Sequence, residues 1–233
     1  MLLPSILGNF GEPLLYLLAL GYGLGSFVGE VRDMPYVTFL ASGIVVSSAM
    51  FTASFESMYS AYTRMEAQRT WDAMLTTPID VDDLVVGEAV WAATKSLVSG
   101  VCILVVGFGL GAMESWLALL ALPVVMLTGL CFASMGLVVT SVARSYDFFL
   151  YYTTLVITPM LMLGGVFFPL ERMPEVIQRV SGVLPLTHAV ALVRPLVTGA
   201  APGSVVLHLL VLIIYTVVAG SLAIGLIRKR MTA

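Results

Sequence analysis

Charged residues are scarce in this sequence, and their scarcity decides the class of protein. Asp, Glu, Lys and Arg make up 11% of the 233 residues, whereas a typical soluble domain has about a quarter. Hydrophobic residues make up 59%, and the mean hydropathy is +1.02. A soluble globular domain is therefore excluded. We expect an all-α polytopic membrane protein, in which each spanning helix needs about 20 largely apolar residues.

Several motifs that carry chemistry are also absent. The sequence has no G-x-x-x-x-G-K-[ST], so nothing in it is expected to cradle the phosphates of a nucleotide. Cys102, Cys131, His188 and His208 lie in apolar stretches without metal-ligand spacing, and we interpret them as packing and hydrogen-bonded structural residues. The basic residues do not form a patch with interleaved aromatics, which argues against a nucleic-acid partner. We expect neither an enzyme nor a metal site.

The stretches free of charge predict the membrane topology, because an ionised side chain at mid-bilayer costs at least ~2.5 kcal/mol. Six are long enough to cross, at residues 13–29, 34–55, 96–113, 115–143, 148–170 and 195–227. Around them we expect transmembrane helices at approximately 11–29, 36–58, 90–112, 116–141, 148–170 and 205–227. A further apolar stretch is too short and is interrupted by Gly182 and Pro185. It favours an external re-entrant segment, 173–194, between spans five and six.

The distribution of Lys and Arg predicts the orientation. With six spans both termini lie on one side, together with Arg64, Arg69, Lys95, Arg144, Arg228, Lys229 and Arg230. The opposite side has Arg32, Arg172, Arg179 and Arg194. Because cytoplasmic loops carry the excess of basic residues, we expect both termini in the cytoplasm.

The passage from residue 65 to residue 88 interrupts this apolar pattern with seven charged side chains. Apolar or small residues recur at helical spacing along one face, which is made of Ala67, Trp71, Met74 and Leu75. Thr77-Pro78 predicts the end of this amphipathic helix, and Asp80 predicts the N-cap of the next one. We expect a short cytoplasmic helix at 65–76. Its polar face carries a single Arg among acids, which favours docking on a protein over lying on lipid headgroups.

The chain resembles the ABC-2 type permease subunits of ABC exporters, and most closely the permeases that export nodulation lipo-oligosaccharides. The resemblance covers almost the full length. It rests on three stretches: GNFGEPLLYLLALGYGLG at 8–25, ASFESMYSAYTRMEAQRTWDAMLTTPIDVDDLVVGE at 53–88, and SYDFFLYYTTLVITPMLMLGGVFFPLERMPEVIQRVSGVLPLTHAVALVRPLVTG at 145–199. The last contains a G-G-x-x-F-P turn followed by L-P-L-T-H. The sequence departs from the family at its start, where only residues 1–10 precede the first expected span and an amphipathic helix is usual.

The resemblance implies partners and a role for the charged passage. Two permease subunits pair with two ATP-binding subunits, which bind ATP and Mg²⁺, so this chain itself is expected to bind no cofactor. The 65–76 helix would be the coupling helix that seats in the ATPase. Its docking residues would be an anchor of Trp71, Met74 and Leu75 and a rim of Glu66, Arg69 and Asp72.

The resemblance also implies a route for an amphipathic or lipid-linked cargo beside spans one and five. Candidate lining residues are Tyr22, Tyr151, Tyr152, Thr154, Thr158, Phe167 and Phe168. An aromatic belt at the membrane interface is the alternative interpretation of the rings at the start of span five. An external cap of Arg172, Arg179 and His188 would meet an anionic group, although ordinary external solvation explains these residues equally well.

The function implied is that of the permease subunit of an ATP-driven exporter, moving a lipo-oligosaccharide or another lipid-linked glycan across the bacterial cytoplasmic (inner) membrane as a homodimer. Drug or antibiotic efflux by an ABC-2 permease is the alternative cargo assignment. A further alternative, from a different functional class, is a stand-alone secondary transporter or membrane scaffold. Secondary transport is disfavoured because ion coupling usually leaves ionisable residues near the midplane, and the six apolar stretches contain none.

Overall fold

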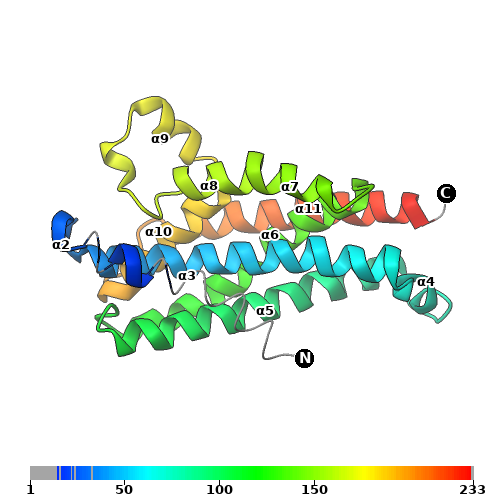
Figure 1. Ribbon diagram of the computed structural model, residues 1–233, viewed down its shortest axis with the longest axis horizontal. Coiled ribbons are helices and arrows are strands. Elements are labelled where there is room, and N and C mark those ends of the chain that lie inside the picture. Colours follow the sequence, from blue (N-terminus) through cyan, green and yellow to red (C-terminus); the bar gives the residue numbers. More distant parts are fainter. Residues whose placement is uncertain (1–14, 16, 22, 24, 33, 232–233) are drawn as a thin grey trace.

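A computed structural model describes residues 15, 17–21, 23, 25–32 and 34–231, and it is a bundle of helices that run along one long axis (Figure 1). The chain enters the described bundle through α2 (Gly25–Val28) and a short antiparallel pair, β1 (Glu30–Val31) and β2 (Met34–Pro35). Within the first predicted span, 11–29, the structure describes residues 15, 17–21, 23 and 25–29, whereas Tyr22 lies outside the described residues.

Four described helices are long and apolar enough to cross a membrane, and they begin and end at Tyr36–Ala67, Val81–Gly109, Trp116–Val142 and Val205–Met231. The first comprises α3 (Tyr36–Phe55) and two π-helical segments, η1 (Glu56–Ser60) and η2 (Thr63–Ala67). The others are α5 (Val81–Gly109), the 3-10 turn η3 (Trp116–Leu120) with α6 (Ala121–Val142), and α11 (Val205–Met231). The chain is thus a predominantly helical membrane protein.

Two of these helices extend beyond the predicted spans. The second predicted span, 36–58, continues as helix to Ala67, and the third, 90–112, already begins at Val81. Both extensions contain charged residues, which the apolar pattern does not predict inside a span. Arg64 of the first extension pairs with Glu88 of the second, and Glu66 and Asp82 pair with arginines of α11, so the helices continue through these charges.

The fifth predicted span, 148–170, is shorter in the structure. Its helix, made of α7 (Asp147–Tyr152), η4 (Thr153–Ile157) and α8 (Thr158–Leu163), ends at Gly164. Gly165 has a φ of +74°, a left-handed conformation that glycine adopts readily. The turn also presses on α3, since a Cβ on Gly43 would lie 2.9 Å from the backbone of Val166. The length of this helix, Asp147–Leu163, is therefore close to the lower limit of ~17 residues for a membrane span.

The predicted re-entrant segment, 173–194, corresponds to a pair of helices that follows the 3-10 turn η5 (Leu170–Arg172). They are α9 (Glu175–Ser181) and α10 (Pro185–Thr198), and they meet at an angle of 89°. Pro185 occupies the first turn of α10, where its missing N–H is tolerated. This geometry is that of a broken span or a re-entrant loop. The packing of α10 against α3, α6 and α11 places it inside the bundle.

The helix α3 is the centre of the bundle and α11 is at its edge. In the helix Tyr36–Ala67, which includes α3, 89% of the most apolar stretch of 18 residues is buried, compared with 22% in α11. Small residues allow the close approach: the α5–α6 contact includes Gly100 against Val125, and Ser48 of α3 shares a hydrogen bond of 2.5 Å with Ser99 of α5. Such contacts are the usual basis of helix association in lipid, where the hydrophobic effect between helices is weak.

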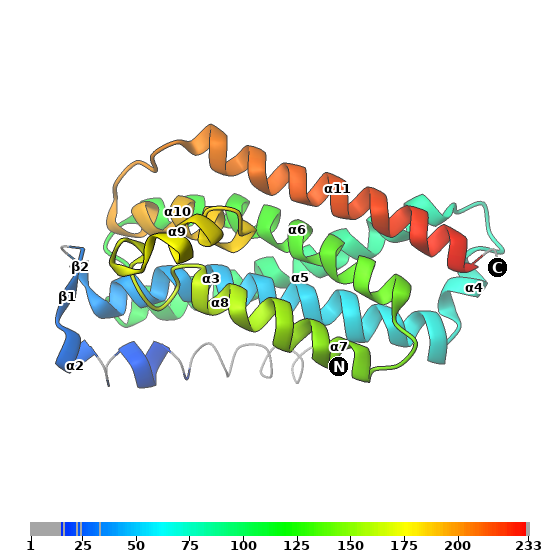
Figure 2. The same ribbon diagram turned by 90° about the horizontal axis from the view of Figure 1, so that it is seen from above.

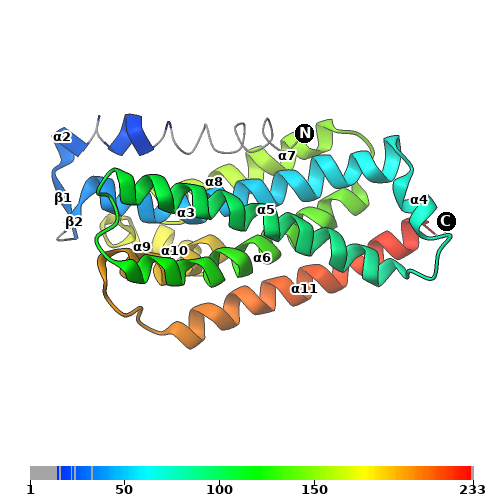
Figure 3. The same cartoon turned by 90° about the horizontal axis from the view of Figure 1, so that it is seen from below.

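The segments that connect the long helices lie at the two ends of the bundle. At one end lie α4 (Thr70–Met74), the turn between α6 and α7, and the C-terminal end of α11; β1, β2 and α2 lie at the other (Figures 2 and 3). We refer to these as the α4 end and the β1–β2 end. The basic residues 64, 69, 144 and 228–230, which were expected to share one side, belong to the α4 end. Lys95 was expected on the same side, but it lies within α5, away from the ends of that helix.

Candidate functional site

The charged passage folds into two helical pieces with a break between them. The helix that begins at Tyr36 ends at Ala67, and Gln68 N–H donates a hydrogen bond to Thr63 O at 2.9 Å. Arg69 then has a φ of +52°, a left-handed conformation that is uncommon for a residue with a side chain. The next helix, α4, is only five residues long. The prediction of one continuous helix at 65–76 is therefore corrected.

The second half of the passage follows its sequence signals. Asp80 is the N-cap residue of α5, and its backbone N–H donates to the carboxylate of Asp83 at 3.4 Å. Asp82 and Asp83 lie in the first turn, where negative charge is stabilised by the helix dipole. The loop between α4 and α5 therefore ends at a well-defined helix start.

A buried carboxylate, Glu56, is the first centre of a polar network that joins this end of α3 to α5. Lys95 Nζ donates to it at 2.7 Å, and Trp91 Nε1 donates at 2.9 Å. Ser60 Oγ, one turn further along the same helix, donates at 2.9 Å. Every contact to this carboxylate is made by a donor, which is the arrangement that a buried anion requires.

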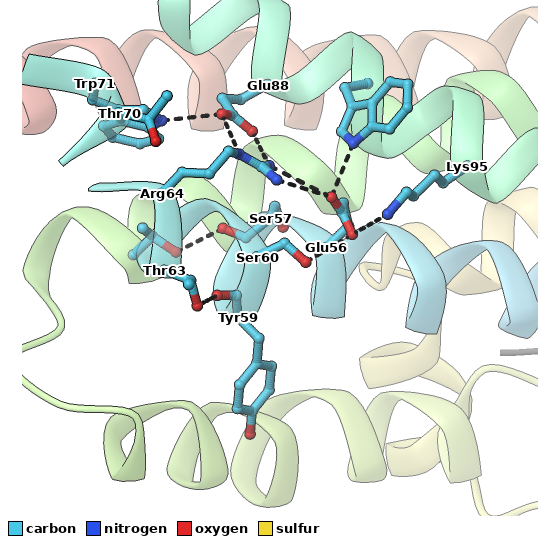
Figure 4. Close-up of polar contacts among 12 residues, drawn as sticks. Glu56, Ser57, Tyr59, Ser60, Thr63, Arg64, Thr70, Trp71, Glu88 and Lys95 are labelled. Carbon is cyan, nitrogen blue, oxygen red and sulfur yellow. Dashed lines mark hydrogen bonds and ion pairs between the residues drawn. The ribbon is translucent and has the colours of Figure 1, made fainter. Parts of the chain in front are cut away.

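Glu88 of α5 is the second centre of the network. It receives Arg64 through Nε at 2.8 Å and through Nη2, which makes the pair bidentate. Trp71 Nε1 of α4 donates to the same carboxylate at 3.0 Å. Figure 4 shows Arg64 between the two acids, and its Nη1 lies 3.4 Å from Glu56. Two acids and two bases thus form one neutral network over α3–η2, α4 and α5.

The energetics make this network a rigid connection. Ion pairs on an exposed surface contribute about 0–1 kcal/mol, but breaking a buried pair by removing one partner costs about 3–5 kcal/mol. Glu56 is among the buried charged residues, and Glu88 and Arg64 are partly buried. A displacement of α4 that keeps the Trp71 hydrogen bond must therefore also move Glu88 and Arg64.

The basic C-terminus contacts the same end of the bundle. Arg230 of α11 donates to Glu66 at 2.8 Å and to the carbonyl oxygens of Thr140 and Ser141 at 2.9 Å. Arg228 donates to Asp82 at 2.6 Å. Sequence reasoning used these arginines for orientation only and missed their contacts, because their acidic partners lie about 150 residues away and no local spacing relates them.

The predicted docking residues divide into buried and exposed groups. Trp71 is 0% exposed and packs within its own chain, so the prediction that its ring anchors a partner is corrected. Leu75 is partly buried and Glu66 is held by Arg230. Arg69 and Asp72 form an exposed ion pair at 3.2 Å, and Met74 is 40% exposed.

A groove at the α4 end exposes apolar groups that a partner can contact. It has a volume of about 570 Å³ and is lined by Arg64, Met74, Ile79, Asp83, Leu84, Gly87, Glu88 and Trp91. Ile79, which is 42% exposed and follows Pro78, was missed because it lies outside the predicted helix. The lining combines apolar residues with the Arg64–Glu88 pair, so an object that fills the groove contacts the network directly.

The predicted cargo residues do not share one surface in the single chain. Four of them are exposed, namely Tyr151, Thr154, Thr158 and Phe168. Phe167 is buried, and the Tyr152 hydroxyl is buried without a hydrogen-bond partner among the described residues. The exposed face of α7–α8 is therefore available to lipid, cargo or another subunit, while the other two side chains point into the bundle.

The predicted external cap is only partly at the surface. Arg172 and Arg179 are exposed, and Arg179 pairs with Glu175 one turn away at 3.4 Å. His188 is instead buried, since its Nδ1 lies 2.7 Å from His208 Nδ1 and its Nε2 lies 2.9 Å from Gly182 O. Its place in the cap is thus corrected. Within the described residues no three His, Cys, Asp or Glu side chains gather as a metal site would require.

Comparison with known proteins shows the family to which this chain belongs. Residues 4–198 match the ABC-2 type transporter family. The chain is 50% identical to Nodulation protein J of Rhizobium leguminosarum bv. viciae over 230 residues, which cover 98% of this chain and 88% of that protein. It is 47% identical to Nodulation protein J of Rhizobium meliloti (strain 1021), over 98% and 87% of the two chains.

A more distant relative is named as a permease. The chain is 26% identical to the inner membrane transport permease YadH of Escherichia coli (strain K12), over 76% of this chain and 69% of that protein. The chain therefore belongs to the ABC-2 type transporter family and is a multi-pass membrane permease. The resemblance noted in its sequence is confirmed.

Proposed function

We propose that this chain is the permease subunit of an ATP-driven exporter, working as two copies with two ATP-binding subunits that bind ATP and Mg²⁺. The observation that carries the proposal is the charged network. It connects an exposed groove at the α4 end to α3 and α5, in a chain whose family belongs to transport. A permease without nucleotide-binding residues of its own needs such a mechanical connection to an outside source of energy.

In this proposal the ATP-binding subunit docks on the groove through Met74 and Ile79, with Arg69 and Asp72 at the edge. Closure of the two ATP-binding subunits displaces α4 and the following loop. Trp71 passes the displacement to Glu88 on α5, and Arg64 passes it to the end of the α3 helix. Because α3 is buried along most of its length, it moves as a rigid element and changes the space between the helices that it contacts.

The proposed orientation puts the α4 end and both termini in the cytoplasm of a bacterial cell, in the cytoplasmic (inner) membrane. The larger share of Lys and Arg at this end supports it. We further propose six spans, with the helix Asp147–Leu163 as the fifth and the α9–α10 pair as an external re-entrant segment. This arrangement leaves the exposed face of α7–α8 in the membrane.

The proposed cargo is a lipo-oligosaccharide or another lipid-linked glycan. The high identity to proteins named Nodulation protein J supports this class of cargo. The exposed side chains of Tyr151, Thr154 and Thr158 add support, because aromatic rings stack on sugar rings and contact acyl chains, and hydroxyls bind glycan hydroxyls.

The test is transport in inside-out vesicles that contain this chain and the ATP-binding subunit of a neighbouring gene. We expect ATP-dependent uptake of a labelled lipo-oligosaccharide and reduced uptake for Tyr151→Ala. The matched control is Phe148→Ala, which removes another exposed ring at the start of α7. Uptake of drugs but not of the glycolipid would reject the cargo assignment, and a lack of any ATP-dependent uptake would reject the exporter assignment.

A further inference from the structure

A second cavity, at the β1–β2 end of the bundle, has a different chemistry from the groove beside α4. It has a volume of about 570 Å³ and lies between β1–β2, the turn after α8, α10 and the start of α11. Figures 2 and 3 show β1, β2 and α10 together at this end. Apolar residues such as Met34, Leu170 and Val190 form part of its wall, and Arg32, Arg194 and His208 form another part.

Arg194 is the central residue of this cavity. Its side chain is held from three sides: Nε donates to Ser42 Oγ at 3.0 Å, Nη2 donates to Gly165 O at 2.7 Å, and Cζ lies 3.7 Å from the centre of the Phe39 ring. The residue is only 6% exposed. All of these partners are neutral, and no described carboxylate lies within ion-pair distance. The guanidinium group is therefore fixed in position, and none of the described acids balances its positive charge, which is costly for a buried ion.

The other charged groups around the cavity do not balance it. Glu171 lines the cavity, but its carboxylate is engaged by Arg32 through Nε at 3.1 Å and through Nη2. His208 contributes a ring that is hydrogen-bonded to His188. The described lining therefore has an excess of positive charge, centred on Arg194.

A second, independent observation comes from Thr187, which also lines this cavity. Its Oγ1 is buried and has no hydrogen-bond partner among the described residues. Buried hydroxyls nearly always have a partner, so an orphaned one indicates a group that is missing from the site. Thr187 lies two turns before Arg194 on the same face of α10, and both line the cavity. A hydroxyl and a cation that face one cavity provide donors that an oxyanion accepts, and Arg is the side chain best suited to bind one.

We propose that this cavity is an oxyanion-binding site, in which Arg194 supplies the charge and Thr187 supplies a further donor. The ligand is a phosphate, sulfate or carboxylate group, either free or as the head of an anionic amphiphile whose apolar part contacts Met34 and Leu170. The site lies at the opposite end of the bundle from the proposed ATPase groove. It goes beyond the proposed function, since binding requires neither ATP nor transport.

The test measures binding to the purified full chain in micelles of the uncharged detergent dodecyl maltoside. The probes are dioleoyl phosphatidate, dioleoylglycerol, which lacks only the phosphate, and inorganic phosphate. Native mass spectrometry counts the bound lipid, and a titration gives its affinity. We expect phosphatidate to bind and dioleoylglycerol not to bind. Competition by inorganic phosphate would show that the site accepts the free ion, whereas a lack of competition would show that it requires the amphiphile.

Three variants make the assignment specific. Arg194→Gln should weaken phosphatidate binding by about 10-fold or more, because a charge-assisted contact is lost. Thr187→Val should weaken it by about 5-fold. Thr187→Val should fold normally, since the hydroxyl has no partner to lose, so this variant keeps the test valid if Arg194→Gln does not fold. The control is Arg172→Gln, which removes an exposed arginine near this cavity that is not part of its described lining.

Two results would overturn the proposal. One is equal binding of phosphatidate and dioleoylglycerol, which would show that the phosphate is not recognised. The other is unchanged phosphatidate affinity in Thr187→Val together with equal losses in Arg194→Gln and Arg172→Gln, which would reduce the effect to overall charge. Either result would leave the proposed export function standing, because neither measurement involves the ATP-binding subunit.

Discussion

At the scale of single residues, Glu56 explains how a charged side chain is accommodated inside this bundle. Its carboxylate accepts hydrogen bonds from Lys95, Trp91 and Ser60 and lies close to Arg64. A buried anion that is satisfied in this way stabilises the fold, and it also fixes the relative positions of the helices that supply the donors.

We predict that Glu56→Gln lowers the free energy of unfolding by about 3 kcal/mol, because the substitution leaves Lys95 without its acid in a partly buried site. Asp72→Asn is the matched control. It breaks only the exposed pair with Arg69 and should cost less than about 1 kcal/mol. Denaturation of both purified variants in detergent measures the difference. Equal losses would mean that the Glu56 network is not a buried one.

The contrast between Trp71 and Met74 shows how far sequence reasoning reached at this scale. Helical spacing places both side chains on one apolar stripe and predicts that the stripe is the surface offered to a partner. The structure buries Trp71 against its own chain because Glu88, on the next helix, accepts its N–H. That partner follows from the three-dimensional packing of α4 on α5, which no local pattern contains.

At the scale of elements, the break between η2 and α4 was the feature least accessible to prediction. Arg69 adopts a left-handed conformation at a position with no glycine or asparagine to signal it. The loop between α4 and α5 was better marked. Pro78 and Asp80 indicated where α4 must end and α5 begins, because their backbone preferences do not depend on tertiary contacts.

We predict that Arg69→Asn and Arg69→Val, which remove the same charge, differ in stability. Asn tolerates the left-handed conformation, whereas a β-branched side chain does so poorly, and Val should be less stable by about 1 kcal/mol. Thermal unfolding of the two purified variants in detergent compares them directly. Equal stability would indicate that the chain does not keep its left-handed turn at this position.

At the scale of the whole molecule, composition predicted the class and the apolar stretches predicted most of the long helices. The lengths were less accurate, because an apolar pattern does not reveal whether a charged side chain is neutralised by another one in the bundle. The Arg64–Glu88 pair lies where two helices continue past their expected ends, and the Lys95–Glu56 pair lies just inside those ends. Conversely, the Gly164–Gly165 turn ended a helix early within an uninterrupted apolar stretch.

The proposed orientation makes a prediction about accessibility from the two sides of the membrane. In a background where Cys102 and Cys131 are replaced by Ala, single cysteines are introduced as Thr76→Cys and Glu175→Cys, both at exposed positions. A membrane-impermeant maleimide should label the cysteine at 175 in intact spheroplasts. The cysteine at 76 should react only after the membrane is opened. Labelling of both, or of neither, in intact spheroplasts would contradict the topology.

The central claim is that the α4 end receives an ATP-binding subunit, and co-purification tests it most directly. The chain is expressed with its genomic neighbours, extracted in mild detergent and isolated as wild type, as Met74→Glu with Ile79→Glu, and as Val176→Glu, an exposed residue of α9. Our account predicts that an ATP-hydrolysing subunit elutes in equal amount with the wild type and with Val176→Glu, and is lost from the double variant because two charges are placed in an apolar contact. If no such subunit elutes with the wild type, or if the double variant retains it as well as Val176→Glu does, the account is contradicted.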